Sequence, residues 1–186
     1  MENIKVIKGN LIDLAKKGKY EAICHGANCF CKMGSGIAVE IKKNFPGAYD
    51  ADCKTESGDI RKLGDFTYFI QNYDDRVLLV FNLYSQYNYN AKTKPLDYEA
   101  LTLSLRKMAW ELKQWKLTKI GMPLIGAGLG GGDLALIIPI IYKELYDFDV
   151  DIVVFDKSPD SEETIKKINY LLKVHEFFNS MKKKEN

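Results

Sequence analysis

Two glycine-rich segments each follow a run of apolar residues and each precede a helical pattern. The first is HGANCFCKMGSGIAVEIKK, residues 25–43, and the second is PLIGAGLGGGDL, residues 123–134. Glycines let backbone N–H groups approach a phosphate closely, and a following helix adds a positive N-terminal dipole. Two such loops on one small chain suggest a ligand with phosphates near its middle. The alternative is a pair of tight strand-to-helix turns that hold no ligand.

His25 ends the first strand pattern and Asp133 ends the second loop, so these are the polar residues best placed for chemistry. An imidazole and a carboxylate can together supply general acid–base catalysis. The alternative is structural, because His25 can be a hydrogen-bonded residue at a strand end and Asp133 can be a helix N-cap. If both loops hold one ligand, we expect the two side chains to converge on its far end.

The second loop also matches the dinucleotide-binding fingerprint at Gly126, Gly128 and Gly131, with Asp149 and Asp151 near the position of the ribose acid. That fingerprint belongs to the first strand–helix turn of a doubly wound sheet, whereas here it follows residue 120 and one strand remains. This argues against a Rossmann dehydrogenase. It favours glycines that clamp a pyrophosphate from the side opposite the first loop.

The cysteines do not form a zinc-binding pattern. Cys29 and Cys31 are a C-x-C pair near Cys24 and Cys53, but no second pair and no His-x-His grouping completes a site. We therefore expect no metal, no other cofactor, and reduced thiols packed under a loop. A nucleophilic Cys29 with His25 as its base is the less favoured alternative.

Length and composition indicate one globular domain. The chain has 186 residues, 46% of them hydrophobic, which is enough to bury a core. A net charge of +2 is too mild to indicate a nucleic-acid-binding protein. The N-terminus, MENIKVIKGN, has no apolar signal core, and no apolar run could span a bilayer, so we expect a cytoplasmic protein without membrane contact. Residues 182–186 are expected to form a basic, solvated tail.

Strand and helix patterns alternate along the chain, with one pair of strands in the middle and an irregular stretch with some helix at 47–62. The alternation predicts a three-layer α/β/α domain with a mixed, mostly parallel sheet. Ligands in such folds bind at the carboxyl ends of strands, where both loops lie. Pro139 is expected to kink the helix that contains it or to mark its start. The predicted strands are 4–8, 21–28, 63–71, 76–86, 119–125 and 150–155, and the predicted helices are 11–17, 36–44, 97–115, 133–146 and 161–182.

On these motifs the whole chain, residues 1–186, resembles a single domain of the macrodomain family. It is most similar to the branch that includes phage and yeast ADP-ribose-1″-phosphate phosphatases. Two glycine-rich motifs in the right order, joined by the right strands, make the resemblance specific. The segments that carry it are VIKGN (6–10), HGANCFCKMGSGIAVEIKKNFPGAY (25–49), LG-x-F (63–66), NLYSQYNY (82–89) and PLIGAGLGGGD (123–133).

The family binds ADP-ribose in a cleft above the sheet, so the resemblance implies a set of ligand-binding residues. Asn28 matches an asparagine near the distal ribose. Asn10 stands where many relatives have an aspartate that contacts adenine N6, and its amide oxygen can accept that bond without charge. Tyr84, Tyr87 or Tyr89 is expected to stack on the adenine or the ribose. The implied ligand-binding residues are Asn10, Leu11, Asn28, Met33, Gly34, Ser35, Gly36, Ile37, Tyr84, Ile125, Gly126, Ala127, Gly128, Leu129 and Gly130.

In the phosphatase branch, residues at the positions of His25 and Asp133 form the catalytic pair. The resemblance therefore implies a monomeric, metal-independent phosphatase that converts ADP-ribose 1″-phosphate to ADP-ribose and phosphate. One alternative is a glycohydrolase that removes ADP-ribose from protein or nucleic acid. That branch uses a lysine where Gln86 stands here, and Lys92 or Lys94 could substitute for it. The other alternative is a non-catalytic ADP-ribose reader. Nucleic acid is expected as a partner only when it is an ADP-ribosylated substrate.

Overall fold

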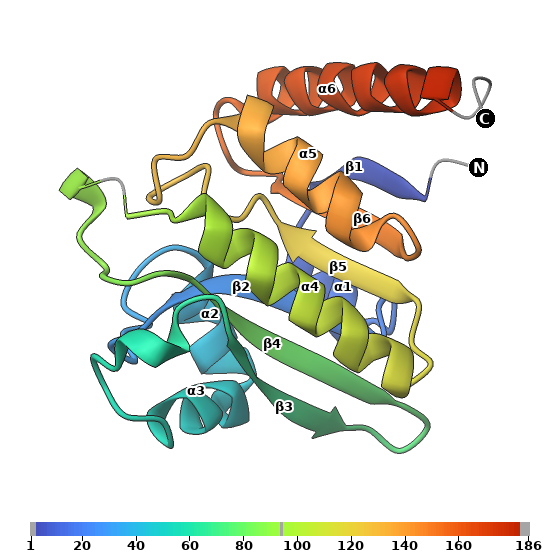
Figure 1. Ribbon diagram of the computed structural model, residues 1–186. Helices are drawn as coiled ribbons and strands as arrows, with labels where there is room; N and C mark the ends of the chain where they lie inside the picture. The colour runs from blue at the N-terminus through green and yellow to red at the C-terminus, as the bar shows by residue number, and fades with distance from the viewer. Residues whose placement is uncertain (1–2, 94, 183–186) are drawn as a thin grey trace.

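The computed structural model describes residues 3–93 and 95–182, which form three layers (Figure 1). The middle layer is a six-stranded sheet made of β1 (Ile4–Gly9), β2 (Ala22–Asn28), β3 (Phe66–Asn72), β4 (Val77–Gln86), β5 (Lys119–Pro123) and β6 (Asp149–Phe155). The strand order is β1-β6-β5-β2-β4-β3. All neighbours are parallel except β3 and β4, which are antiparallel. The predicted mixed, mostly parallel sheet is confirmed.

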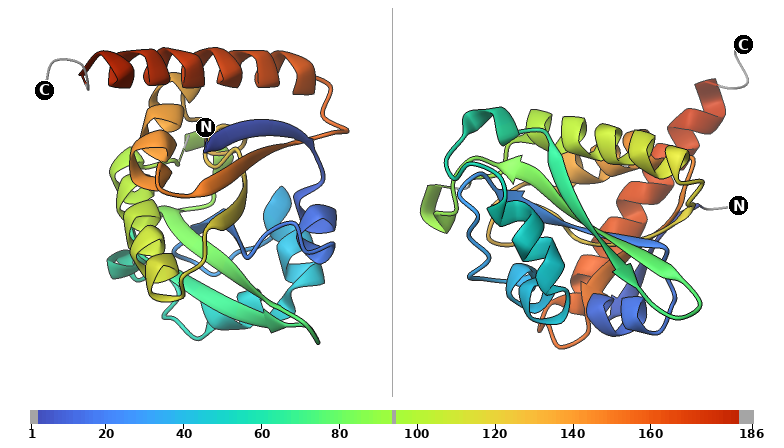
Figure 2. Two further views of the ribbon diagram at one scale, coloured as in Figure 1. Left: turned by 90° about the vertical axis from the view of Figure 1, so that its right-hand side faces the viewer. Right: turned by 90° about the horizontal axis from the view of Figure 1, so that it is seen from below.

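Helices cover both faces of the sheet (Figure 2). Two hydrophobic clusters, one on each face, hold the layers together. On one face lie α1 (Leu11–Lys16), α2 (Ile37–Asn44) and α3 (Pro46–Cys53), and on the other lie α4 (Tyr98–Gln114), α5 (Leu134–Leu145) and α6 (Ser161–Lys182). Short 3₁₀ turns, η1 (Ile60–Lys62) and η2 (Ala91–Thr93), lie in the connections before β3 and before α4.

Helix α4 shows how the local sequence sets an element. Its N-cap is Asp97, whose Oδ1 accepts a hydrogen bond from the third backbone N–H of the helix at 2.9 Å. Leu101, Leu105, Met108 and Leu112 recur every three or four residues and are all fully buried against the sheet. The helix predicted at 97–115 is therefore present, with Asp97 as its N-cap.

The sequence left two possibilities for helix α5, which were a kink at Pro139 or a start near that residue. It starts at Leu134, directly after the N-cap Asp133, and continues through Pro139. The proline therefore lies within the helix and does not mark its start. Ile137 and Ile141 are fully buried on the face toward the sheet, so packing holds the helix around a residue that lacks a backbone donor.

Two strand boundaries differ from the prediction by more than one residue, and both differences have local reasons. Strand β3 starts at Phe66 because Gly64, with φ of +79°, makes a turn and donates its N–H to the Tyr84 carbonyl oxygen at 2.9 Å. Strand β5 ends at Pro123, which has no N–H for a ladder. Ile125 then donates back to the Pro123 carbonyl oxygen at 2.8 Å, and the chain turns into the second glycine-rich loop.

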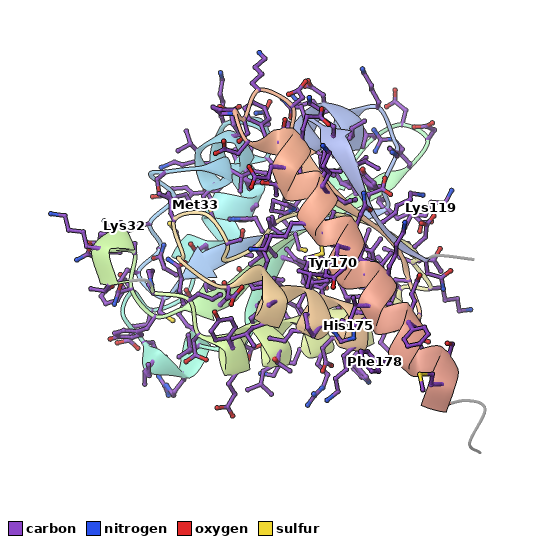
Figure 3. The ribbon with its side chains drawn as sticks, turned by 90° about the horizontal axis from the view of Figure 1, so that it is seen from above. Lys32, Met33, Lys119, Tyr170, His175 and Phe178 are labelled. Atoms are coloured by element: carbon purple, nitrogen blue, oxygen red, sulfur yellow. The ribbon has the colours of Figure 1, made fainter. Side chains whose placement is uncertain are left out.

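Helix α6 packs across β1, β6 and α5, and its outer surface carries exposed aromatic side chains. Tyr170 is 68% exposed and Phe178 is 58% exposed. Figure 3 shows both side chains on α6, away from Lys32 and Met33 of the first glycine-rich loop. No helix among the described residues is long and apolar enough to cross a membrane.

Candidate functional site

A cavity of about 650 Å³ opens between the two glycine-rich loops. The first loop follows β2 and the second follows β5, and these neighbouring strands are parallel. Their carboxyl ends therefore meet at one edge of the sheet, at the left in Figure 1. A volume of this size is typical of sites for small organic ligands. The predicted ligand-binding residues that line the cavity are Asn28, Gly34, Ser35, Gly36, Ile37, Ile125, Gly126, Gly128, Leu129 and Gly130.

Asn28 closes the first loop onto itself. Its Oδ1 accepts hydrogen bonds from the backbone N–H of Phe30 at 3.0 Å and of Lys32 at 3.3 Å, and its Nδ2 donates to the Lys32 carbonyl oxygen at 2.7 Å. The loop ends at Gly36, which has φ of +57° and gives helix α2 no side-chain cap. Gly36 and Ile37 both line the cavity, so the uncapped N-terminus of α2 borders it.

The glycines of the second loop have two different tasks. A Cβ on Gly126 or Gly132 would lie 2.6 or 2.3 Å from the Leu96 side chain, and a Cβ on Gly130 would lie 2.7 Å from a carbonyl oxygen. Those glycines are needed for packing. Gly128 has no heavy atom within 4 Å of its Cβ position and lines the cavity. Bulk at Gly128 would therefore enter the cavity without disturbing the fold.

The cavity carries one positive charge at its wall. Among the lining residues that the structure describes, Lys32 has the only charged side chain, and it is solvent-exposed. Cys31, the residue before it, has φ of +56°, and its Sγ lies 3.3 Å from Lys62 Nζ. Lys62 is buried and also lies 3.3 Å from the buried Asp52 carboxylate. This pair anchors the loop that presents Lys32.

The structure does not bring His25 and Asp133 together at the cavity, and neither residue lines it. Side chains alternate along a strand, so Gly26 faces the cavity and His25 faces the opposite side, under α3. His25 is fully buried, and its Nε2 lies 2.8 Å from Asn82 Oδ1, while Asn82 donates to the Ala48 carbonyl oxygen at 2.8 Å. Asp133 is exposed and caps α5. In this structure His25 is therefore a hydrogen-bonded residue inside β2, and Asp133 is a helix N-cap.

Several other predicted ligand residues also lie outside the cavity wall. Asn10 caps α1, because its Oδ1 accepts from the Ile12 N–H at 2.9 Å, so that oxygen is already engaged. Tyr84 is buried and donates its hydroxyl to Asp52 Oδ1 at 2.8 Å, whereas Tyr89 is the tyrosine that lines the cavity. The predicted residues that do not line the cavity, besides the His25 and Asp133 pair, are Asn10, Leu11, Met33, Tyr84 and Ala127.

Other residues complete the wall and were not singled out from the sequence. Lys32 stands inside the first glycine-rich motif, so its charge was a readable signal. Ser85 and its neighbours at the end of β4 enter the site because β4 pairs with β2, which a single sequence does not reveal. The additional lining residues are Gly26, Lys32, Ala38, Ser85, Pro95, Pro123 and Leu124.

The residues that the sequence suggested as alternative catalytic groups lie in different places relative to the cavity. Gln86 lines the cavity and donates its amide to the Asn88 carbonyl oxygen at 2.8 Å. Lys92 is exposed and is not part of the wall, and Lys94 lies outside the described residues. Burial raises the pKa of the Cys29 thiol to about 11, so little of the nucleophilic thiolate forms near neutral pH. The described residues contain no cluster of side chains suited to a metal ion.

The burial of His25 predicts a pH-dependent stability. Burial lowers the pKa of His25 below its ordinary value of about 6.5. The unfolded chain therefore takes up a proton that the folded protein resists, and stability is lost as the pH falls below about 6.5. Urea unfolding between pH 7.5 and 5.5 should show a slope of at most about 1.4 kcal/mol per pH unit from this residue. His25→Gln should flatten the slope, and His175→Gln should retain it. Equal slopes in all three proteins would contradict the assignment.

The open space at Gly128 predicts a clean block of the cavity. Gly128→Glu should fold normally because nothing lies within 4 Å of the new Cβ. Its carboxylate should abolish binding of a diphosphate ligand by repulsion and by occupied space. Gly128→Ala is the matched control, because it adds the Cβ without charge and should keep most of the affinity. Titration calorimetry with ADP-ribose checks both, and unchanged affinity in a folded Gly128→Glu protein would refute the assignment of this loop.

The chain is similar to known proteins in sequence and in structure. A family model described as Macro domain matches residues 24–141. The chain is 36% identical over 159 residues to an Enterobacteria phage T4 protein described as an uncharacterized 17.5 kDa protein in the tk-vs intergenic region, covering 84% of this chain and 97% of that one. It is 29% identical over 130 residues to the human ADP-ribose glycohydrolase OARD1, covering 68% and 73%. Thermosipho africanus DarTG in complex with ADP-ribose matches with a TM-score of 0.66 at 16% identity, covering 83% and 42%. The chain therefore belongs to the Macro domain family.

Proposed function

We propose that this protein binds ADP-ribose in the cavity and acts as a glycohydrolase that releases ADP-ribose from modified macromolecules. The observation that carries the proposal is the cavity itself, bounded by two glycine-rich loops and by the uncapped N-terminus of α2. Backbone N–H groups and the Lys32 ammonium favour a diphosphate held between the loops. The human relative that matches this chain is an ADP-ribose glycohydrolase.

The position of His25 favours a glycohydrolase over the phosphatase expected from the sequence. Hydrolysis of ADP-ribose 1″-phosphate by an imidazole–carboxylate pair needs both groups at the terminal phosphate. His25 is buried under α3, outside the cavity wall. Release of ADP-ribose from a macromolecule breaks the bond at C1″, and water supplies a hydroxyl to that carbon and a proton to the leaving group. This reaction does not need the His25 imidazole.

In this proposal Asp133 activates the attacking water. Asp133 does not line the cavity, but unlike His25 it is exposed, and it lies three residues after Gly130, which lines the cavity. Its Oδ1 accepts from the Ala135 N–H at 2.9 Å, and its Oδ2 accepts no hydrogen bond from any described residue. The Asp133 N–H bonds the Tyr98 hydroxyl at 2.8 Å, which fixes the backbone. One carboxylate oxygen is thus held as a cap, and the other can accept a proton.

Asp133→Asn separates these two tasks. Asparagine caps a helix about as well as aspartate, so stability should be unchanged, but an amide cannot serve as a general base. We expect kcat for ADP-ribose release to fall about 10²–10⁴-fold with unchanged ADP-ribose affinity. Chromatography of released ADP-ribose gives kcat, and calorimetry gives affinity. Asp97→Asn, which alters the cap of α4 away from the reaction, is the matched control and should retain activity.

A panel of substrates decides between the two hydrolases. We would offer a protein with ADP-ribose on carboxylate side chains, an ADP-ribosylated DNA oligonucleotide, and ADP-ribose 1″-phosphate. Release of ADP-ribose from either macromolecule supports the proposal. Phosphate release from the third substrate alone would replace it with the phosphatase. Tight ADP-ribose binding with no turnover of any substrate would make the protein a reader.

The charge of Lys32 should contribute to binding only when the ligand carries phosphates. Lys32→Ala should weaken ADP-ribose binding by about 5-fold at low salt and less at high salt, because the side chain is exposed and screened. Adenosine, which has no phosphate, should bind both proteins equally. Lys43→Ala removes an exposed charge of α2 that does not line the cavity, and its affinity should match that of the wild type. Equal affinity of the Lys32→Ala and Lys43→Ala proteins for ADP-ribose would contradict this role.

A further inference from the structure

Ser85 presents a buried hydroxyl to the cavity without a partner. Its side chain belongs to a residue only 1% exposed, and the residue lines the cavity. No group among the described residues hydrogen-bonds its Oγ. The other buried side-chain atoms in this state are Arg76 Nη1 and Asp151 Oδ1, which belong to residues that do not line the cavity. Burying an unpaired hydroxyl is unfavourable, so a polar group of a ligand is the expected partner of Ser85.

Ser85 lies at an irregularity in the pairing of β2 with β4. Ala27 of β2 pairs with Tyr84 of β4, but the next residue, Asn28, pairs with Gln86, so Ser85 is an extra residue on β4. An extra residue of this kind is a β-bulge, which re-aims a side chain and is common beside functional sites. The Ser85 carbonyl oxygen accepts the Asp97 N–H at 3.0 Å, which holds the bulge in place.

Gly26 lets the hydroxyl of Ser85 pack close to strand β2. A Cβ on Gly26 would lie 3.0 Å from Ser85 Oγ and 3.1 Å from Ile125 Cγ2. Gly26 does not have a positive φ, so its backbone conformation does not require glycine. Glycine is required because the side chains of Ser85 and Ile125 pack closely at this position. The bulge, the missing side chain and the unpaired hydroxyl therefore point to the same place at the floor of the cavity.

We propose that Ser85 Oγ hydrogen-bonds a ribose hydroxyl of the bound nucleotide. The proposal rests on the proposed function, because it assigns this contact to ADP-ribose. Ser85 Oγ and the apolar Ile125 Cγ2 both lie beside Gly26, whereas the Lys32 charge and the N-terminus of α2 belong to the first loop. A neutral group that both donates and accepts suits this position better than a phosphate. The contact makes Ser85 a residue that selects for the sugar.

The test measures affinity for three ligands in wild type and in Ser85→Ala. ADP-ribose has two ribose units, ADP has one, and pyrophosphate has none. Ser85→Ala should lower ADP-ribose affinity by about 10-fold, the effect of leaving a ligand hydroxyl unpaired, and should not affect pyrophosphate. A loss of affinity for ADP-ribose alone assigns the contact to the distal ribose. A loss of affinity for both ADP-ribose and ADP assigns it to the adenosine ribose.

Two further variants separate binding from folding. Ser104→Ala removes a buried serine of α4 that bonds the Leu101 carbonyl oxygen and does not line the cavity, so its ligand affinities should stay unchanged. Gly26→Ala should weaken ADP-ribose binding, because its Cβ covers the Ser85 hydroxyl. The ligand-free Ser85→Ala protein should unfold at the same temperature as wild type or higher, since it loses an unpaired hydroxyl.

The outcomes are distinct. Unchanged ADP-ribose affinity in Ser85→Ala overturns the inference and leaves the proposed function standing. Equal losses for all three ligands, or a lowered unfolding temperature, also overturn it, because Ser85 would then act through the fold. A wild-type protein that does not bind ADP-ribose overturns the inference together with the proposed function. A wild type that binds but turns over no substrate overturns only the hydrolase, because the affinity measurements need no reaction.

Discussion

Strand β2 pairs with β4 on one side and with β5 on the other, and both pairings are parallel. This constraint determines the rest of the site. The carboxyl ends of the three strands reach the same edge, so the loops that follow them converge there whatever their distance in sequence. Residues near 26, 85 and 125 thereby form one floor, although the chain separates them by two or more elements.

The cavity depends on glycines, which have no side chain. Gly126, Gly130 and Gly132 allow the second loop to pack tightly, and Gly26 allows Ser85 and Ile125 to pack against β2. Gly128 leaves open space at the cavity wall. A Cβ on Gly36 of the first loop would lie 3.8 Å from Leu129 of the second, so the loops face each other across the cavity. The closely packed glycines hold the second loop in place, and Gly128 of the same loop then borders the cavity.

A chain of buried and partly buried polar contacts supports the first loop. It joins the central strands to the residue that precedes Lys32, and every link is between 2.8 and 3.3 Å. Buried polar groups that are fully paired rigidify their surroundings, whereas unpaired ones are costly. His25, which the sequence suggested as a catalytic residue, is part of this scaffold. The chain runs through His25, Asn82, Thr67, Tyr84, Asp52, Lys62 and Cys31.

The sequence by itself determined the alternation of strands and helices and the two glycine-rich loops at the carboxyl ends of β2 and β5. These features depend on local periodicity and on backbone preferences, which neighbouring residues express directly. Only the tertiary structure decided that His25 faces α3 and that Ser85 faces the cavity. The face that a strand residue takes depends on register, bulges and the helices packed above it, and those are set by pairing between distant segments.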